Sequence, residues 1–244
     1  MLLTLFAMLW LPLGQYVYLV ENWMKIGTYA APFLVFGTVA FRDSVRSPQL
    51  LMDFRAFSVG LFVAYIAHQY EEHWIDLFGN HYAFLENVNQ MFAHTTSCAG
   101  ITNCPLTPEA IFVINTSLVW LVGFIAIWRA PEHLFPALAM SAIVIVNAFT
   151  HIVAGVVRWA YNPGLLTSVL IFIPVSITFF FQVLQYNRGY KRQIIGSLIW
   201  AILAHVVMVG GLLLANLFRL IPESLYFTAL VVWSCLPLFM FREE

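Results

Sequence analysis

The sequence is short of charge: Asp, Glu, Lys and Arg make up 9% of its 244 residues, and the formal net charge is −1. Its 11 basic residues are scattered, which argues against a nucleic-acid surface and against a polybasic lipid anchor. No Lys or Arg precedes Lys25, so the first apolar stretch lacks the positive region of a cleaved signal peptide. We therefore expect no nucleic-acid partner, and we expect this first stretch to be a helix.

Hydrophobic residues, in contrast, make up 61% of the chain, and its mean hydropathy is +0.84. Water-soluble domains are about 45–50% apolar, so the composition predicts an integral membrane protein. Apolar runs of roughly 20 residues, the length that crosses the hydrocarbon, predict a single all-α transmembrane bundle of about eight helices over residues 1–244. The expected spans are Leu2–Val20, Lys25–Phe41, Ala56–Asp76, Pro108–Trp128, His133–Val157, Pro163–Tyr186, Gln193–Phe218 and Pro222–Phe241.

The distribution of basic residues predicts the orientation in the membrane, because cytoplasmic loops carry an excess of Lys and Arg. With both termini cytoplasmic, eight basic residues lie inside and three outside. The outer three are Lys25, Arg158 and Arg219. We therefore expect both termini on the cytoplasmic side.

A long connection, residues 77–107, is expected on the outer side because it contains neither Lys nor Arg. Tyr82, Phe84, Leu85, Val88, Met91 and Phe92 have helix-like spacing, which predicts a short interfacial helix that caps the bundle. Cys98 and Cys104 are close enough in sequence for a disulfide in an oxidising compartment, or they are two unrelated thiols. Cys235 falls in the last span, where packing is its expected role.

One span contains the run His68-Gln69-Tyr70-Glu71-Glu72-His73. Ionisable residues at membrane depth are costly and indicate a functional site. His68, Glu71 and Glu72 are three and four residues apart, so they share one helix face. His73 lies about 140° from His68 around the helix, so we expect it at the rim or hydrogen-bonded to a neighbouring helix.

Other spans contribute further polar residues. Asn147 and His151 are one helical turn apart, and Arg158 continues their stripe. His205 and Asn115 each interrupt an otherwise apolar stretch. A rise of about 1.5 Å per residue places these groups in one layer, in the middle to outer half of the bilayer. We therefore expect them to converge on one cavity.

Imidazole and carboxylate groups together are the ligand set of Zn²⁺ and of non-haem iron. This predicts metal ligation by His68, Glu71, Glu72, His151 and His205, with Glu71 and Glu72 also as the catalytic carboxylates. Groups expected to orient a ligand or contact substrate are Asn115, Asn147, Arg158 and His73. The alternatives are a buried polar network that fixes helix packing, a hydrogen-bonded core role for His205 and a snorkelling role for Arg158.

One helix start is marked by Asn162-Pro163-Gly164. Asn is a preferred N-cap residue and Pro is favoured at the first helical position, so this segment predicts a helix from Pro163. The positive end of the helix dipole would face the polar layer and favour an anionic or carbonyl-bearing substrate, or the segment is simply a well-capped helix start.

These motifs resemble a family of small bacterial membrane proteins named for its HXXEE motif. The resemblance rests on His68-Gln69-Tyr70-Glu71-Glu72, on Asn147-Ala148-Phe149-Thr150-His151-Ile152 and on the Pro-Gly element at Tyr161-Asn162-Pro163-Gly164. It covers roughly residues 60–215, and nothing is carried over to residues 1–55. It implies the bacterial cytoplasmic membrane but no particular reaction.

We therefore expect a membrane enzyme that depends on a divalent transition metal, Fe or Zn, and that acts on a lipid-like or isoprenoid substrate. The first alternative is a metal-free cyclase, in which Glu71 or Glu72 protonates an isoprenoid. The second is a proton-coupled or cation transporter with Glu and His as its relay. The third is an assembly subunit whose polar layer binds a partner chain.

Overall fold

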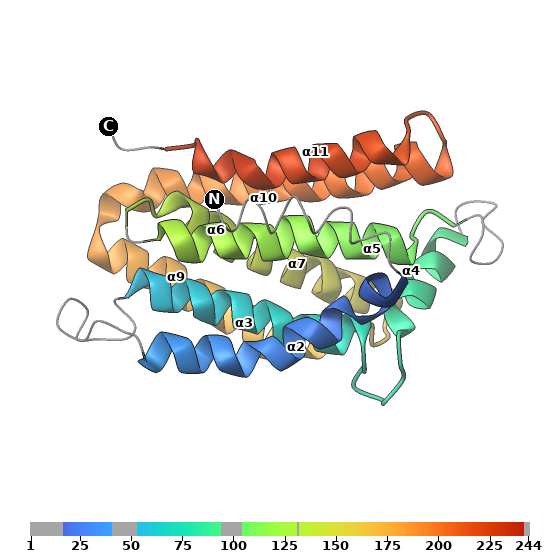
Figure 1. Cartoon of the computed structure of the whole chain (residues 1–244), viewed down its shortest axis with the longest axis horizontal. Coiled ribbons are helices and arrows are strands. Elements are labelled where there is room, and N and C mark those ends of the chain that lie inside the picture. The colour runs from blue at the N-terminus through green and yellow to red at the C-terminus, as the bar shows by residue number, and fades with distance from the viewer. Residues whose placement is uncertain (1–16, 41–52, 94–103, 131, 242–244) are drawn as a thin grey trace.

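The computed structural model describes residues 17–40, 53–93, 104–130 and 132–241. Within these ranges the protein is an all-α bundle without strands. Its long helices run roughly along one axis, and the short helix α4 lies at one end of them (Figure 1). Three stretches of wider, π-helical winding (η3, η4 and η6) are continuous with the long helices.

The helices follow in chain order. They are α2 (Val17–Ala40), α3 (Phe54–His73), α4 (Ala83–Ala93), α5 (Pro108–Ile114), η3 (Asn115–Leu121), α6 (Val122–Arg129), α7 (Phe135–Arg158), α8 (Leu165–Thr167), η4 (Ser168–Phe172), α9 (Ile173–Tyr186), η5 (Arg188–Tyr190), α10 (Lys191–Leu212), η6 (Leu213–Leu217), α11 (Glu223–Cys235) and η7 (Leu236–Leu238).

Four helical stretches of the described chain are long and apolar enough to cross a membrane: 108–129, 135–158, 165–186 and 188–217. The chain is an integral membrane protein. Helix α3 packs among these spans against α6 and α7. It is less apolar than they are because its last two turns carry the polar run from His68 to His73.

The predicted break between the first two helices is wrong. Residues 1–16 lie outside the described residues, but Val17–Ala40 form one continuous helix. The polar residues at the predicted break are satisfied locally, because Asn22 donates to the Tyr18 carbonyl and Lys25 donates to Asn22. Pro32 lies inside the helix without ending it, and Gly27 allows close contact with Trp120.

The six later spans are helical as predicted, with their ends displaced by a few residues. The helix expected within the connection 77–107 is α4, Ala83–Ala93.

Cys104 is disulfide-bonded, and Cys98, its expected partner, lies outside the described residues. Cys235 is a free thiol. The capping residues of α3 and α5 are Asp53 and Thr107, which accept hydrogen bonds from first-turn amides.

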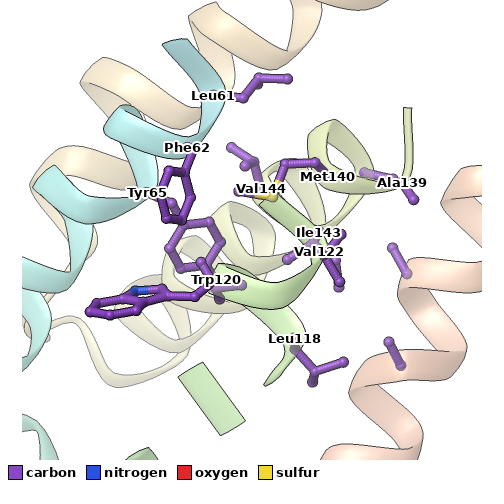
Figure 2. Close-up of a cluster of buried hydrophobic side chains, with 14 of the residues drawn as sticks. Leu61, Phe62, Tyr65, Leu118, Trp120, Val122, Ala139, Met140, Ile143 and Val144 are labelled. Atoms are coloured by element: carbon purple, nitrogen blue, oxygen red, sulfur yellow. The ribbon is translucent and has the colours of Figure 1, made fainter. Parts of the chain in front are cut away.

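One half of the bundle, the packed end, is closely filled by apolar side chains. Figure 2 shows side chains from α3, the η3–α6 stretch and α7 meeting there, with Phe62 among those of α3. Its backbones approach closely through small residues that are fully buried, namely Ala137, Ala139, Ala142, Ala201 and Ala204. Small residues at helix contacts stabilise membrane bundles because lipid tails supply no hydrophobic driving force.

Candidate metal centre

Glu71 and Glu72 are both buried, and consecutive helix positions turn them about 100° apart, toward different neighbours. Glu71 accepts hydrogen bonds from the backbone amides of Leu166 and Thr167 at 3.0 and 2.7 Å. The hydroxyls of Tyr161 and Thr167 add two more at 2.9 and 2.6 Å. Four donors thus satisfy the Glu71 carboxylate, which caps the helix that starts at Leu165.

The predicted helix start at Asn162-Pro163 is therefore wrong in detail. The helix begins at Leu165 with Gly164 as its N-cap, and no side chain of the cap residue bonds the first turn. Glu71, from another helix, accepts the free amides instead and neutralises the positive end of the dipole. This helix end is consequently unavailable for an anionic substrate.

Tyr161 connects this cap to the loop after α3. Its hydroxyl donates to Glu71 and accepts the amide of Leu77 at 3.0 Å. Burial raises the pKa of the Tyr161 hydroxyl above its ordinary value, and the neighbouring Glu71 carboxylate acts in the same direction. Tyr161 therefore remains a donor at neutral pH.

The Glu72 carboxylate lies among three imidazoles. Its Oε1 is 3.2 Å from His151 Nε2, and its Oε2 is 3.4 Å from His68 Nε2 and 2.9 Å from His73 Nε2. All four side chains are buried. The ligand atoms of His68, Glu72 and His151 lie within 4.8 Å of one another, which is a geometry that can hold a metal ion.

Hydrogen bonding assigns the tautomer of His68. The Thr167 hydroxyl lies 2.6 Å from Glu71 Oε2 and 2.8 Å from His68 Nδ1. Its single proton goes to the carboxylate, so Thr167 must accept from His68 Nδ1–H. Because a neutral imidazole has only one N–H, the Nε2 atom of neutral His68 has a lone pair, which lies 3.4 Å from Glu72 Oε2 and accepts a hydrogen bond from Asn147 at 3.1 Å.

His151 has the same tautomer for a similar reason. Asn162 donates its amide to the His151 carbonyl at 3.0 Å, which directs Asn162 Oδ1 at His151 Nδ1, 2.7 Å away. His151 Nδ1 therefore carries a proton. In the neutral imidazole Nε2 then faces Glu72 with a lone pair, whereas in the imidazolium Nε2 donates to Glu72. In their neutral forms, both imidazoles thus direct toward the same carboxylate a nitrogen that could bind a metal ion.

A chain of side chains leads to His73 from the packed end. The Trp120 indole donates to Gln69 Oε1 at 3.0 Å, and Gln69 donates to Asn115 Oδ1 at 2.9 Å. This orients the Asn115 amide group toward His73 Nε2, 3.2 Å away. His73 is hydrogen-bonded to a neighbouring helix, as its position in the sequence predicts.

Gly164 closes the other side of the site. Its φ of +93° is a conformation that residues with a side chain rarely adopt. A Cβ atom here would lie 2.7 Å from His68 Cε1 and 2.8 Å from His151 Cε1. Glycine therefore lets the backbone pack directly on both imidazoles and hold them in place.

The site borders a cavity of about 470 Å³. Glu72, His73 and His151 line it, and most of the remaining wall is apolar, with Phe84, Met208 and Leu212 among the lining residues. A cavity of this size suits a small molecule. His73 also lines a second cavity of about 440 Å³ beneath α2 and α4.

The predicted residues thus divide into three groups. His68, Glu72 and His151 converge, with Asn147 donating to His68 Nε2 at 3.1 Å. His205 lines the cavity but does not join the group, and its Nδ1 donates to the carbonyl of Ala201 in its own helix. Arg158 lies at the exposed end of α7, where it donates to Asn87 at 2.7 Å.

Sequence reasoning missed the roles of several residues around the site. Thr167 and Asn162 orient the two imidazoles, and Gln69 lies inside the polar run without having been assigned a role. The position of Gln69 was the available signal, since a buried amide in a membrane helix needs hydrogen-bond partners. Thr167 carried no signal, because single threonines are common in transmembrane helices.

Comparison with known proteins gives one match. Residues 59–179 match a family model described as "Protein of unknown function with HXXEE motif". The match ends earlier than the predicted residue 215, but it contains both motifs and the Pro-Gly element. No curated protein and no solved structure matches the chain. Over residues 59–179, which supply His68, Glu72, His151 and the groups that orient them, the chain belongs to the HXXEE-motif family.

Proposed function

We propose that this protein is a metal-dependent membrane enzyme that acts on an apolar, lipid-like substrate. His68, Glu72 and His151 bind one divalent transition metal ion, zinc or iron. The substrate occupies the adjoining cavity, which it enters from the bilayer. We place the site in the outer half of a bacterial cytoplasmic membrane, with both termini in the cytoplasm.

The observation that carries this proposal is the pair of imidazole lone pairs aimed at one carboxylate. When both imidazoles are neutral and carry their protons on Nδ1, no hydrogen lies between either Nε2 atom and Glu72. The contacts at 3.2 and 3.4 Å would then repel. A cation among these atoms converts the repulsion into coordination and supplies the charge that a buried carboxylate needs.

The distances also suit coordination. Ligands about 2.0–2.1 Å from a tetrahedral ion lie about 3.3 Å apart. His68 and His151 each donate their second nitrogen to an oxygen acceptor, an arrangement that orients metal-binding imidazoles. Two histidines and one carboxylate leave a further position for water or substrate, as catalytic sites require.

The identity of the ion decides the class of reaction. Bound zinc lowers the pKa of water and supports hydrolysis of an ester or amide. Iron held by two histidines and one carboxylate supports oxygen-dependent chemistry on a hydrocarbon. In either case the chain itself orients the ligands, excludes bulk water and binds the apolar part of the substrate. Glu71, with four hydrogen bonds, serves to position Thr167 and through it His68.

The test is metal analysis of the full chain, purified in a non-ionic detergent without chelators. We expect about one equivalent of zinc or iron per chain and its loss in His68→Ala, Glu72→Ala and His151→Ala. Thr167→Val, which removes the acceptor of His68 together with one of the four hydrogen bonds to Glu71, should weaken metal affinity about 10- to 100-fold. His133→Ala is the matched control, because His133 lies near the opposite end and contacts the Met240 carbonyl.

Cobalt substitution gives a second readout, since its visible spectrum reports the ligand geometry. Wild-type protein should show the bands of a tetrahedral or five-coordinate nitrogen and oxygen site, and Glu72→Ala should not. Metal-free wild-type protein that binds no added Zn²⁺, Fe²⁺ or Co²⁺ would overturn the proposal. The remaining enzymatic alternative would then be metal-free acid catalysis, with a proton shared between Glu72 and His151.

A further inference from the structure

The cavity of about 470 Å³ is open to the surface of the bundle, and we call this opening its mouth. Met91 from α4, Thr150 from α7 and Val209 from α10 all line the cavity, and all three are exposed. These residues come from three separate helices, so the cavity reaches the surface where the helices meet. An apolar molecule can therefore enter from the bilayer without crossing water.

The cationic side chain of Arg158 lies beside this mouth. Arg158 is exposed, and its Nη1 donates to Oδ1 of Asn87, which itself lines the cavity. Within the described part of the chain, Arg158 forms no ion pair with a carboxylate. A guanidinium has five N–H donors, so most of those on Arg158 remain available to an anion.

The stripe along α7 connects this cation to the metal centre. Asn147, His151 and Ala154 line the cavity, and Arg158 lies one turn beyond Ala154. Arg158 is seven residues from His151, which is about 10 Å along the helix axis. The charge therefore lies near the membrane surface, where lipid head groups reside, and the ligands lie deeper, among the acyl chains.

From this arrangement we infer that the substrate is a single-chain amphiphile with an anionic head group, a carboxylate or a phosphate. Arg158 binds the head group at the mouth, and the apolar chain runs past Thr150 and Ala154. The reacting part of the substrate lies about 10 Å from its charge, beside Glu72 and His151. This inference rests on the proposed function, because it assigns the substrate class of the same site.

The experiment measures binding of four radiolabelled probes to the immobilised full chain in maltoside micelles, by scintillation proximity. The probes are hexadecanoate, hexadecyl phosphate, hexadecanol and inorganic phosphate. Both anionic amphiphiles should bind about 10- to 100-fold more tightly than hexadecanol, the range expected for a charge-assisted hydrogen-bonded contact. Inorganic phosphate should not bind measurably, since it lacks the apolar chain.

Arg158→Gln should remove the preference for the anions, and Arg158→Lys should retain part of it. Arg219→Gln is the matched control: it removes another cation expected on the outer side, one that does not line the cavity, and should change nothing. Asn87→Leu removes the hydrogen-bond partner and leaves the cation, so binding should persist. Equal loss in Asn87→Leu and Arg158→Gln would show that the contact between α7 and α4 matters rather than the charge, and would overturn the inference.

Metal content measured on the same preparations separates this inference from the proposed function. Arg158→Gln should keep its metal, because it contacts none of the three ligands. If wild-type protein binds metal but does not distinguish hexadecanol from the anions, the substrate class is wrong and the metal centre stands. If wild-type protein prefers the anions but takes up no metal, the metal centre is wrong.

Discussion

The two ends of the bundle use the same helices in opposite ways. At the packed end, α3, α6 and α7 meet through Leu61, Val122 and Ala139, which are fully buried in the hydrophobic core. At the other end, the site end, the same α3 and α7 hold buried imidazoles and a carboxylate beside a cavity of about 470 Å³. Apolar packing fixes the positions of α3 and α7 at the packed end. The same two helices can therefore hold buried polar side chains at the site end.

The winding of the helices changes between the two ends. The π-helical stretch η3 begins at Asn115, and η4 begins at Ser168, directly after Thr167. π-Helical turns often occur at functional sites, because the wider turn displaces a side chain from its regular position. Here each one adjoins a residue that orients a histidine.

The largest effect should come from removing Glu71. Glu71→Ala leaves two amides and two hydroxyls without their acceptor, and we expect unfolding free energy to fall by about 3 kcal/mol or more. Glu72→Ala in chelator-treated protein should cost less, because Glu72 faces lone pairs. Unfolding by denaturant in micelles measures the free energy of unfolding of both variants. Equal losses of stability in the two variants would show that Glu71 and Glu72 contribute equally to the fold.

An intermediate effect is expected at two glycines, one at each end. Gly164→Ala combines a positive φ with contacts to both imidazoles, so it should cost about 1–3 kcal/mol and also weaken metal binding. Gly123→Ala at the packed end would place a Cβ 2.5 Å from Phe62, with a cost of about 1–3 kcal/mol and unchanged metal content.

Gly60→Ala is the control for both, because nothing lies within 4 Å of a Cβ there. It should leave metal content unchanged and stabilise α3 by about 0.5–1 kcal/mol. Metal loss in Gly123→Ala as complete as in Gly164→Ala would contradict the separation of the two ends.

The smallest effect concerns pH. The Tyr161 pKa is raised in the folded state, so the folded protein retains a proton that the unfolded chain releases above about pH 10. The stability from this group is complete below that pH and declines as the pH rises further. The midpoint temperature of thermal unfolding should therefore fall more steeply between about pH 10 and 12 in wild-type protein than in Tyr161→Phe. The same pH dependence in both proteins would show that the hydrogen bond between Tyr161 and Glu71 does not contribute to stability.

The sequence predicted the parts of this structure that follow from periodicity and hydropathy. The later spans, the cap helix and the spacing of His68 with Glu72 are regular features of single helices. The division of roles between Glu71 and Glu72 was not predictable, because it depends on where α8 begins relative to α3. The same holds for Thr167 and Asn162, whose partners His68 and His151 are 99 and 11 residues away in the chain.

The cap that Glu71 places on α8 has a consequence for biogenesis. His68 is oriented only after Thr167 has docked against Glu71, and that contact spans 96 residues. A nascent chain that has inserted only its first helices therefore has the HXXEE motif without a competent binding site. If the site binds a metal ion as proposed, the protein would acquire that ion only after the segment around Gly164 has entered the membrane.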